Sequence, residues 1–200
     1  VIVVAKARGG VGKTTTAVNL ALALREGPGR KAGPARRVAV VDFDVQNGSV
    51  GAFLDVEDTG AVIDLLRTGD LPDAGLLGRA LVQHPSGLAV LPAPIEMAPV
   101  DALTAPMVDR LIALLRARFD HVVVDSPPVL SVTDARILGT MVDGVILVIK
   151  GGETPKEAVQ RTKRLLQEVH AHIIGTLLNN VNVRSADYHY YSKYYYYGYG

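Results

Sequence analysis

Cysteine is absent from the 200-residue chain, which excludes disulfides and cysteine-ligated metals and is typical of a reducing compartment. No apolar run reaches the roughly 18 residues that a membrane-spanning helix needs, and no signal peptide is visible. Neither sign of charge dominates. The 21 basic and 20 acidic residues give a formal net charge of +1, so the composition indicates no nucleic-acid partner. The length predicts one well-buried domain.

Tyrosine is missing from the first 187 residues, and all 8 tyrosines lie between Tyr188 and Tyr199. An average composition would scatter them through core and surface. From residue 184 onward the chain is polar and aromatic, with no hydrophobic period that would bury it. We therefore predict a folded domain over residues 1–183 and a flexible tyrosine-rich tail over 184–200. A low-complexity segment that stacks or self-associates is the alternative for the tail.

Short apolar segments rich in β-branched residues alternate with amphipathic segments along the chain. This pattern predicts an α/β fold, with a mostly parallel sheet covered by helices on both faces. Strands are expected at Val1–Ala5, Val38–Val41, Leu88–Leu91, His121–Val124, Val145–Ile149 and Ile173–Leu178, each apolar on both faces. Helices are expected at Lys13–Glu26, Ala61–Arg67, Ala105–Arg118, Val132–Met141 and Thr154–His170. The basic segment Gly27–Arg37 is expected to be a surface loop.

A glycine-rich loop between the first strand and the first helix predicts a phosphate site of the P-loop type. Three glycines let successive backbone N–H groups converge on one oxyanion, and the positive end of the helix dipole adds to the same point. Lys13 is expected to reach the β- and γ-phosphates, and the Thr14 hydroxyl to bind Mg²⁺. Ala7 occupies the first glycine position of the pattern G-x-x-x-x-G-K-S/T. The predicted nucleotide contacts are Gly9, Gly10, Val11, Gly12, Lys13, Thr14 and Thr15.

Two further apolar strands end in aspartates, in the segments Val41-Asp42-Phe43-Asp44 and Val124-Asp125-Ser126. Because ligands of open α/β sheets lie at the carboxyl ends of the strands, these carboxylates are expected to face the phosphates. We expect Thr14, Asp42 and Asp125 to hold Mg²⁺. Asp42 is also the candidate to position or deprotonate the nucleophile, and Asp44 is expected to assist with the metal or with charge. Lys13 and the three aspartates form the predicted catalytic set.

These motifs resemble the bacterial tyrosine kinases that use a P-loop fold. The resemblance covers essentially the whole chain, and the eukaryotic kinase signatures H-R-D and D-F-G are absent. It rests on the glycine loop, the two aspartate-ended strands and the segments Val132-Thr133-Asp134-Ala135, Val142-Asp143-Gly144-Val145, Leu178-Asn179-Asn180-Val181 and Tyr194-Tyr195-Tyr196-Tyr197-Gly198-Tyr199-Gly200.

The resemblance implies an ATP- and Mg²⁺-dependent tyrosine autokinase that regulates synthesis and export of capsular or extracellular polysaccharide. Asn179 would hydrogen-bond the adenine. The phosphoacceptors would be Tyr188, Tyr190, Tyr191, Tyr194, Tyr195, Tyr196, Tyr197 and Tyr199, modified between copies of the chain in a homo-oligomer. A membrane adaptor of the polysaccharide chain-length-regulator type would be the partner. A cytoplasmic location at the inner face of the membrane follows, through that partner or a segment upstream of Val1.

One departure from the kinase pattern favours a second interpretation, a Min- or Par-type positioning or partition ATPase that hydrolyses ATP without phosphorylating protein. The segment Asp42-Phe43-Asp44-Val45-Gln46 replaces the D-x-D-x-R of the kinases and looks more like those ATPases. Arg8, however, stands where they carry a signature lysine, and its planar guanidinium is not equivalent to an ammonium group. The tyrosine tail also favours the kinase interpretation.

Overall fold

The computed structural model describes residues 1–7, 9–27, 35–45, 47–96, 104–127, 129 and 141–182. The predicted tail and its tyrosines lie outside these residues, as do Arg8, Gln46, most of the basic segment 27–37 and all but the last residue of the helix predicted at Val132–Met141. No helix in these ranges is long and apolar enough to cross a membrane.

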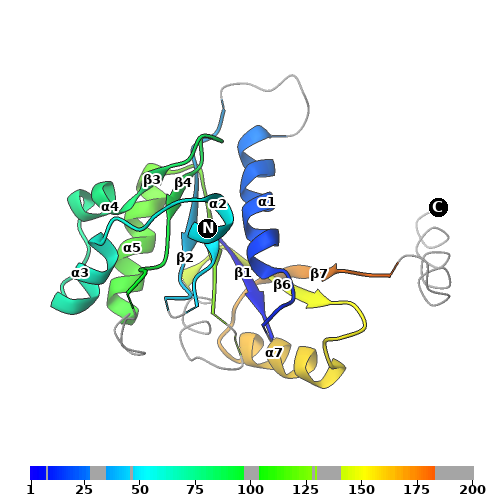
Figure 1. Ribbon diagram of the computed structural model, residues 1–200. Helices are drawn as coiled ribbons and strands as arrows, with labels where there is room; N and C mark the ends of the chain where they lie inside the picture. Colours follow the sequence, from blue (N-terminus) through cyan, green and yellow to red (C-terminus); the bar gives the residue numbers. More distant parts are fainter. Residues whose placement is uncertain are drawn as a thin grey trace.

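Seven strands form one sheet in the order β3-β4-β2-β5-β1-β6-β7 (Figure 1). All neighbouring pairs are parallel except β3 and β4, which confirms the predicted class. The strands are β1 (Ile2–Lys6), β2 (Val38–Asp42), β3 (Val82–Gln83), β4 (Ala89–Leu91), β5 (His121–Asp125), β6 (Gly144–Lys150) and β7 (Ile173–Asn179). The described helices are α1 (Lys13–Glu26), α2 (Val50–Leu54), α3 (Ala61–Thr68), α4 (Ala74–Ala80), α5 (Ala105–Arg118) and α7 (Lys156–Glu168).

Helices cover both faces of the sheet because alternate strand residues point to opposite sides. Val4, Val40 and Val123 pack into a core under α1 and α2. Val3 and Val41 belong to the opposite core, which contains residues of α4, α5 and α7. Figure 1 shows α1 standing against the sheet, with α3, α4 and α5 grouped at the β3–β4 side. The central strands are therefore apolar on both faces, as the sequence predicted.

Three short elements escaped the prediction, namely α2, α4 and β3. A helix of five or seven residues spans at most two turns and shows no helical period in the sequence. The two-residue strand β3 is recognisable only by its antiparallel pairing with β4. The helix expected over Thr154–His170 is shorter, because the Thr154 hydroxyl accepts a hydrogen bond from the Lys150 amide at 3.0 Å and α7 begins at Lys156.

The expectation that every strand is covered on both faces is wrong for β7. This strand lies at the edge of the sheet, beside β6 alone. Ile174 is 53% exposed and Leu178 is 58% exposed, although both were expected in the interior. An edge position is invisible in the sequence because an apolar edge strand has the composition of a buried one. The position matters for function, since β7 carries Asn179 to the carboxyl edge of the sheet.

Candidate nucleotide-binding site

The glycine loop between β1 and α1 adopts the backbone conformation that a phosphate site requires. Gly10 and Gly12 have positive φ angles of 74° and 84°, which residues with a Cβ rarely adopt. Gly12 is the N-cap of α1, and no side chain caps the helix there. The first N–H groups of α1 therefore have no partner within the helix and are free to bind an anion.

A cavity of about 200 Å³ lies against this loop. It is lined by Lys6, Ser49 and the loop residues Gly10, Val11, Gly12, Lys13, Thr14 and Thr15. Gly9 instead lines a neighbouring cavity of about 280 Å³ with Val11, Lys150, Glu153 and Thr154. The structure thus brings six of the seven predicted loop residues to one cavity, while Lys6 and Ser49 are additions that the sequence analysis missed.

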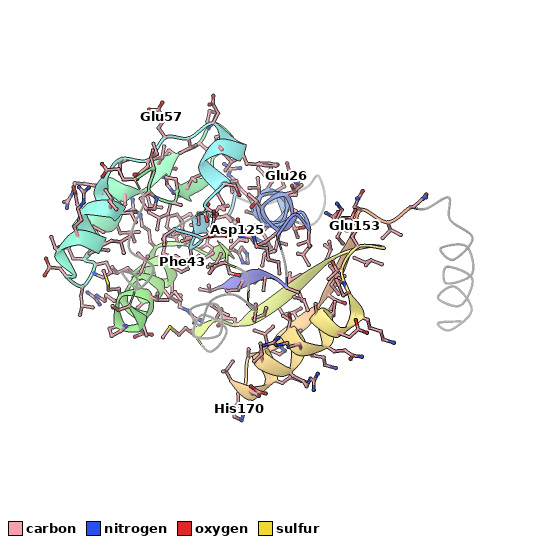
Figure 2. All side chains as sticks on the ribbon, turned by 60° about the horizontal axis from the view of Figure 1, so that its bottom comes forward. Glu26, Phe43, Glu57, Asp125, Glu153 and His170 are labelled. Carbon is pink, nitrogen blue, oxygen red and sulfur yellow. The ribbon has the colours of Figure 1, made fainter. Side chains whose placement is uncertain are left out.

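A buried network joins Lys13, Thr14 and Asp125, and Figure 2 shows Asp125 in the interior of the molecule. Lys13 Nζ lies 2.7 Å from Asp125 Oδ1, and both side chains are almost fully buried. The Thr14 hydroxyl donates to Asp125 Oδ2 at 2.7 Å. Ser49 Oγ lies 2.8 Å from Thr14 Oγ1 and must donate to it, because the only proton of Thr14 is directed at Asp125.

The donor set of this network fits a hard divalent cation. Among the described residues, Asp125 Oδ1 is a buried oxygen that receives no hydrogen bond of normal geometry, although Lys13 lies close to it. The Thr14 hydroxyl contacts the same carboxylate. Carboxylate and hydroxyl oxygens, completed by water and phosphate oxygens, are the ligands that Mg²⁺ prefers. In the described ranges no three acidic or histidine side chains are arranged so that they could hold a metal ion by themselves, so the protein alone supplies few ligands.

Asp42, at the end of β2, is held by backbone amides. Its Oδ2 accepts hydrogen bonds from the amides of Ser49 and Val50 at 2.8 and 2.9 Å, and its Oδ1 accepts one from Asp44 at 3.1 Å. Burial raises the pKa of Asp42 to about 6, and the negative charge of Asp125 adds to the rise, while the Val50 amide opposes it. The carboxylate therefore links β2 to the start of α2, and Ser49 connects it to Thr14.

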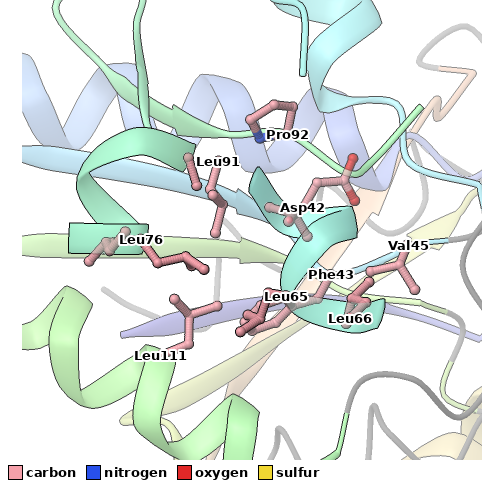
Figure 3. A pocket seen from close by; sticks show the side chains of 12 residues that line it. Asp42, Phe43, Val45, Leu65, Leu66, Leu76, Leu91, Pro92 and Leu111 are labelled. Carbon is pink, nitrogen blue, oxygen red and sulfur yellow. The ribbon is translucent and has the colours of Figure 1, made fainter. Parts of the chain in front are cut away.

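The environment of Asp42 explains the large desolvation effect. A small apolar cavity of about 20 Å³ lies beside it, lined mainly by leucines of α3, α4, α5 and β4. Figure 3 shows the Asp42 carboxylate directed away from Leu65, Leu66 and Leu111. This cavity is too small and too apolar for a nucleotide. Its apolar lining excludes water from one side of Asp42, which disfavours the charged form of the carboxyl group.

Asp44 faces a residue that the sequence analysis did not single out. Its Oδ2 lies 3.7 Å from Nζ of Lys6, the last residue of β1. Both side chains are mostly buried, at 14% and 6% exposure. Burial and the nearby charge of Lys13 lower the pKa of Lys6, and Asp44 partly offsets them. A charged residue directly after four apolar strand residues was the signal available in the sequence.

Asn179 at the end of β7 reaches the glycine loop. Its Nδ2 donates to the Val11 carbonyl at 2.9 Å, so the loop and the edge strand are joined directly. A Cβ built on Gly12 would lie 2.1 Å from the same nitrogen. The amide group thus lies beside the nucleotide-binding loop, and its contact with adenine stays a prediction. The predicted phosphoacceptor tyrosines lie outside the described residues.

The fold and the site define the class of this protein as a P-loop nucleotide-binding domain. Residues 1–180 match the family model described as an AAA domain. The chain is 30% identical to the tyrosine-protein kinase YwqD of Bacillus subtilis over 199 residues, which cover 98% of this chain and 77% of the relative. It superposes on the crystal structure of the VpsO kinase domain with a TM-score of 0.76 and 28% identity, covering 90% of this chain and 84% of that one.

The chain therefore belongs to the AAA domain family and, within it, to the bacterial tyrosine-protein kinases, as the motifs predicted. A ParA family ATPase from Chlorobium tepidum has a TM-score of 0.70, covering 92% of this chain and 75% of that one, but at 19% identity it shares only the fold. Cobyrinic acid a,c-diamide synthase from Mycobacterium smegmatis, solved with an ATP analog and magnesium, has a TM-score of 0.66 and 28% identity, covering 88% of this chain and 71% of that one. The comparisons favour the kinase interpretation over the partition-type alternative.

Proposed function

We propose that this chain is an ATP-dependent tyrosine autokinase that transfers the γ-phosphate of Mg-ATP to the tyrosines between Tyr188 and Tyr199 of another copy. The proposal is carried by the cavity of about 200 Å³ against the glycine loop, called the phosphate cavity below, which lies beside Lys13 and the uncapped start of α1. The chain that contains it is related to tyrosine-protein kinases over nearly its whole length. The tail supplies acceptors that the folded domain lacks, because the first 187 residues contain no tyrosine.

Lys13 and the loop amides neutralise the phosphate charge in this proposal. Phosphoryl transfer asks the protein mainly for alignment and electrostatic stabilisation, and a lysine beside backbone N–H groups provides both. Lys13 already lies in the cavity, held by Asp125 at 2.7 Å. Thr14 and Asp125, with Asp42 as the third predicted ligand, would hold Mg²⁺, which supplies charge neutralisation of the phosphate oxygens when bound. A triphosphate would then compete with Asp125 for the Lys13 ammonium group.

Asp42 is the proposed proton acceptor. A tyrosine hydroxyl has a pKa near 10, so it needs a base as its oxygen bonds to the γ-phosphorus and the bond to the β-phosphate oxygen breaks. With a pKa of about 6, Asp42 is mostly ionised at neutral pH yet more basic than an ordinary carboxylate. Its hydrogen bonds to backbone amides fix its position. Asp44 would assist from beside Lys6, and Asn179 would contact the adenine.

The biological role we propose is control of capsular or extracellular polysaccharide synthesis and export, together with a membrane adaptor of the chain-length-regulator type. Each phosphotyrosine adds about −1.5 to −2 charges, so a few of them would make the tail strongly anionic and self-repelling. The aspartates next to the site would then repel a modified tail, and any assembly held by tail docking would loosen. Homo-oligomerisation and a place at the inner face of the membrane belong to the same proposal.

Mass spectrometry of the whole chain after incubation with Mg-ATP tests the kinase reaction. Phosphate on Tyr188–Tyr199 is the expected result, and replacing Lys13 with Met should abolish it. Lys156→Met is the matched control, because Lys156 is exposed at the start of α7 and lines neither cavity beside the glycine loop. Release of inorganic phosphate without protein labelling would favour the partition-type ATPase instead. Labelling that persists in Lys13→Met would place the reaction at another site.

A further inference from the structure

The phosphate cavity is lined by a second lysine besides the one in the P-loop pattern. Lys6 ends β1, and its side chain lines the same cavity as the glycine loop and Ser49. Its backbone is fixed on two sides, because it pairs with Val148 of β6 and its carbonyl accepts a hydrogen bond from the Val129 amide at 3.0 Å. The flexible four-carbon side chain can still rotate, so the ammonium group can reach different parts of the cavity without a backbone rearrangement.

The partner of Lys6 holds it less closely than the partner of Lys13 does. Lys13 lies 2.7 Å from Asp125, whereas Lys6 lies 3.7 Å from Asp44, beyond ordinary hydrogen-bonding distance. The carboxylate of Asp44 is also shared, since its Oδ1 accepts the Asn47 amide at 3.3 Å. A phosphate oxygen at hydrogen-bonding distance therefore adds more interaction energy for an ammonium group in such a long ion pair than for one that is already in a short ion pair.

Two ammonium groups beside one cavity repel each other, and each destabilises the charged form of the other unless an anion lies between them. The pKa of Lys6 is lowered by burial and then by the charge of Lys13, and Asp44 and Asp125 oppose the shift. A bound anion with several negative charges removes this repulsion. A triphosphate carries its additional charge on the terminal phosphate, so a second cation discriminates it from a diphosphate.

We propose that Lys6 is a second phosphate-binding lysine, supplied by the same chain. Its ammonium group would move from Asp44 to the terminal phosphate of ATP and bind it there. Lys13 would grip the phosphates from the start of α1, and Lys6 would approach them from the end of β1. The site would thereby prefer ATP to ADP, which favours release of the product after phosphoryl transfer. The inference rests on the proposed use of ATP by this site, and it does not depend on which acceptor receives the phosphate.

Calorimetric titration of the whole chain with ADP and with a non-hydrolysable ATP analogue, both with Mg²⁺, tests the inference. The quantity compared is the ratio of the two dissociation constants. Lys6→Met should reduce the preference for the analogue about tenfold, the effect of losing one charge-assisted hydrogen bond, with ADP affinity within about twofold of wild type. Lys6→Arg should retain most of the preference, and the exposed-lysine control Lys156→Met should retain all of it. An unchanged ratio in Lys6→Met, including equal weakening of both nucleotides, would overturn the proposal.

A second pair of variants covers the case in which Lys6→Met fails to fold because Asp44 is left buried without its cation. The double variant Lys6→Met/Asp44→Asn contains neither charge and is compared with Asp44→Asn alone, so any effect of Asp44 on the metal cancels. The double variant should again prefer the analogue about tenfold less than its reference does. Equal ratios in the two variants would refute the role of Lys6. Because the readout is binding, the result is independent of whether any tyrosine is labelled.

Discussion

Replacing Gly12 with Ala should destabilise the folded domain through two separate effects that the structure specifies. Gly12 has a φ angle of +84°, and forcing an L-residue into the left-handed region costs about 1–2 kcal/mol. The new Cβ would also lie 2.1 Å from Nδ2 of Asn179, which must move away. Moving it breaks the 2.9 Å hydrogen bond to the Val11 carbonyl, which contributes about 1 kcal/mol. The expected loss is therefore about 2–3 kcal/mol.

Two neighbouring glycines supply matched controls for this substitution. Gly10 also has a positive φ angle, but a Cβ there meets nothing within 4 Å, so Gly10→Ala should cost only the conformational strain of about 1–2 kcal/mol. Gly9 has neither a positive φ angle nor a close neighbour, and Gly9→Ala should leave the free energy of unfolding within about 0.5 kcal/mol of wild type. Urea denaturation of the nucleotide-free protein, followed by circular dichroism, measures all three values.

A double-mutant cycle separates strain from the lost hydrogen bond. Asn179→Ala alone should cost about 1 kcal/mol, but in the Gly12→Ala background it should cost almost nothing, because the bond is already broken. The coupling energy is therefore expected to be about 1 kcal/mol. Strictly additive costs would refute the reasoning, since they would mean that Asn179 keeps its bond to the loop when a Cβ is present at position 12.

Two further predictions concern the buried charges of the site. Because the pKa of Asp42 is raised to about 6 in the folded protein, its contribution to stability is fully present below pH 4 and is lost as the pH rises to about 6. In urea denaturation, the free energy of unfolding of the wild type should decrease by about 3 kcal/mol as the pH rises over this range, and Asp42→Asn should lack this decrease. Identical pH profiles of the two proteins would contradict the raised pKa of Asp42. Lys13→Met should destabilise the nucleotide-free protein by about 3 kcal/mol because it leaves Asp125 buried and unpaired, whereas Lys13→Met/Asp125→Asn should recover much of this loss. A double variant as unstable as the single one would show that the ion pair is not the cause.

The long elements of the fold followed from local patterns. Helices α1 and α5 begin and end at the predicted residues, since each is long enough for several turns. The predicted strands were found within one residue at each end, because their β-branched runs are bounded by polar residues or turns. Helix α2 could not be predicted in this way, because its start depends on the carboxylate of Asp42 accepting amides from seven and eight residues further along the chain.

The sequence by itself determined the class of site. The order of glycines, lysine and threonine after an apolar strand dictates a loop whose amides converge on phosphate, whatever packs around it. It also placed the aspartates at strand ends, and parallel pairing then brought Asp42 level with Asp125. The unusual concentration of tyrosine after residue 187 is likewise a property of the sequence alone.

Only the tertiary structure decided how the charges of the site are paired. Lys6 and Asp44 lie 38 positions apart, and Asn179 and Val11 are separated by 168, so no local pattern relates them. Their contacts arise because strands from distant parts of the chain end at one edge of the sheet. Burial there raises the pKa of Asp42 and lowers that of Lys6, and burial is a consequence of packing. The residues of the nucleotide site could thus be recognised in advance, but which lysine is tightly paired and which is available to a phosphate could not.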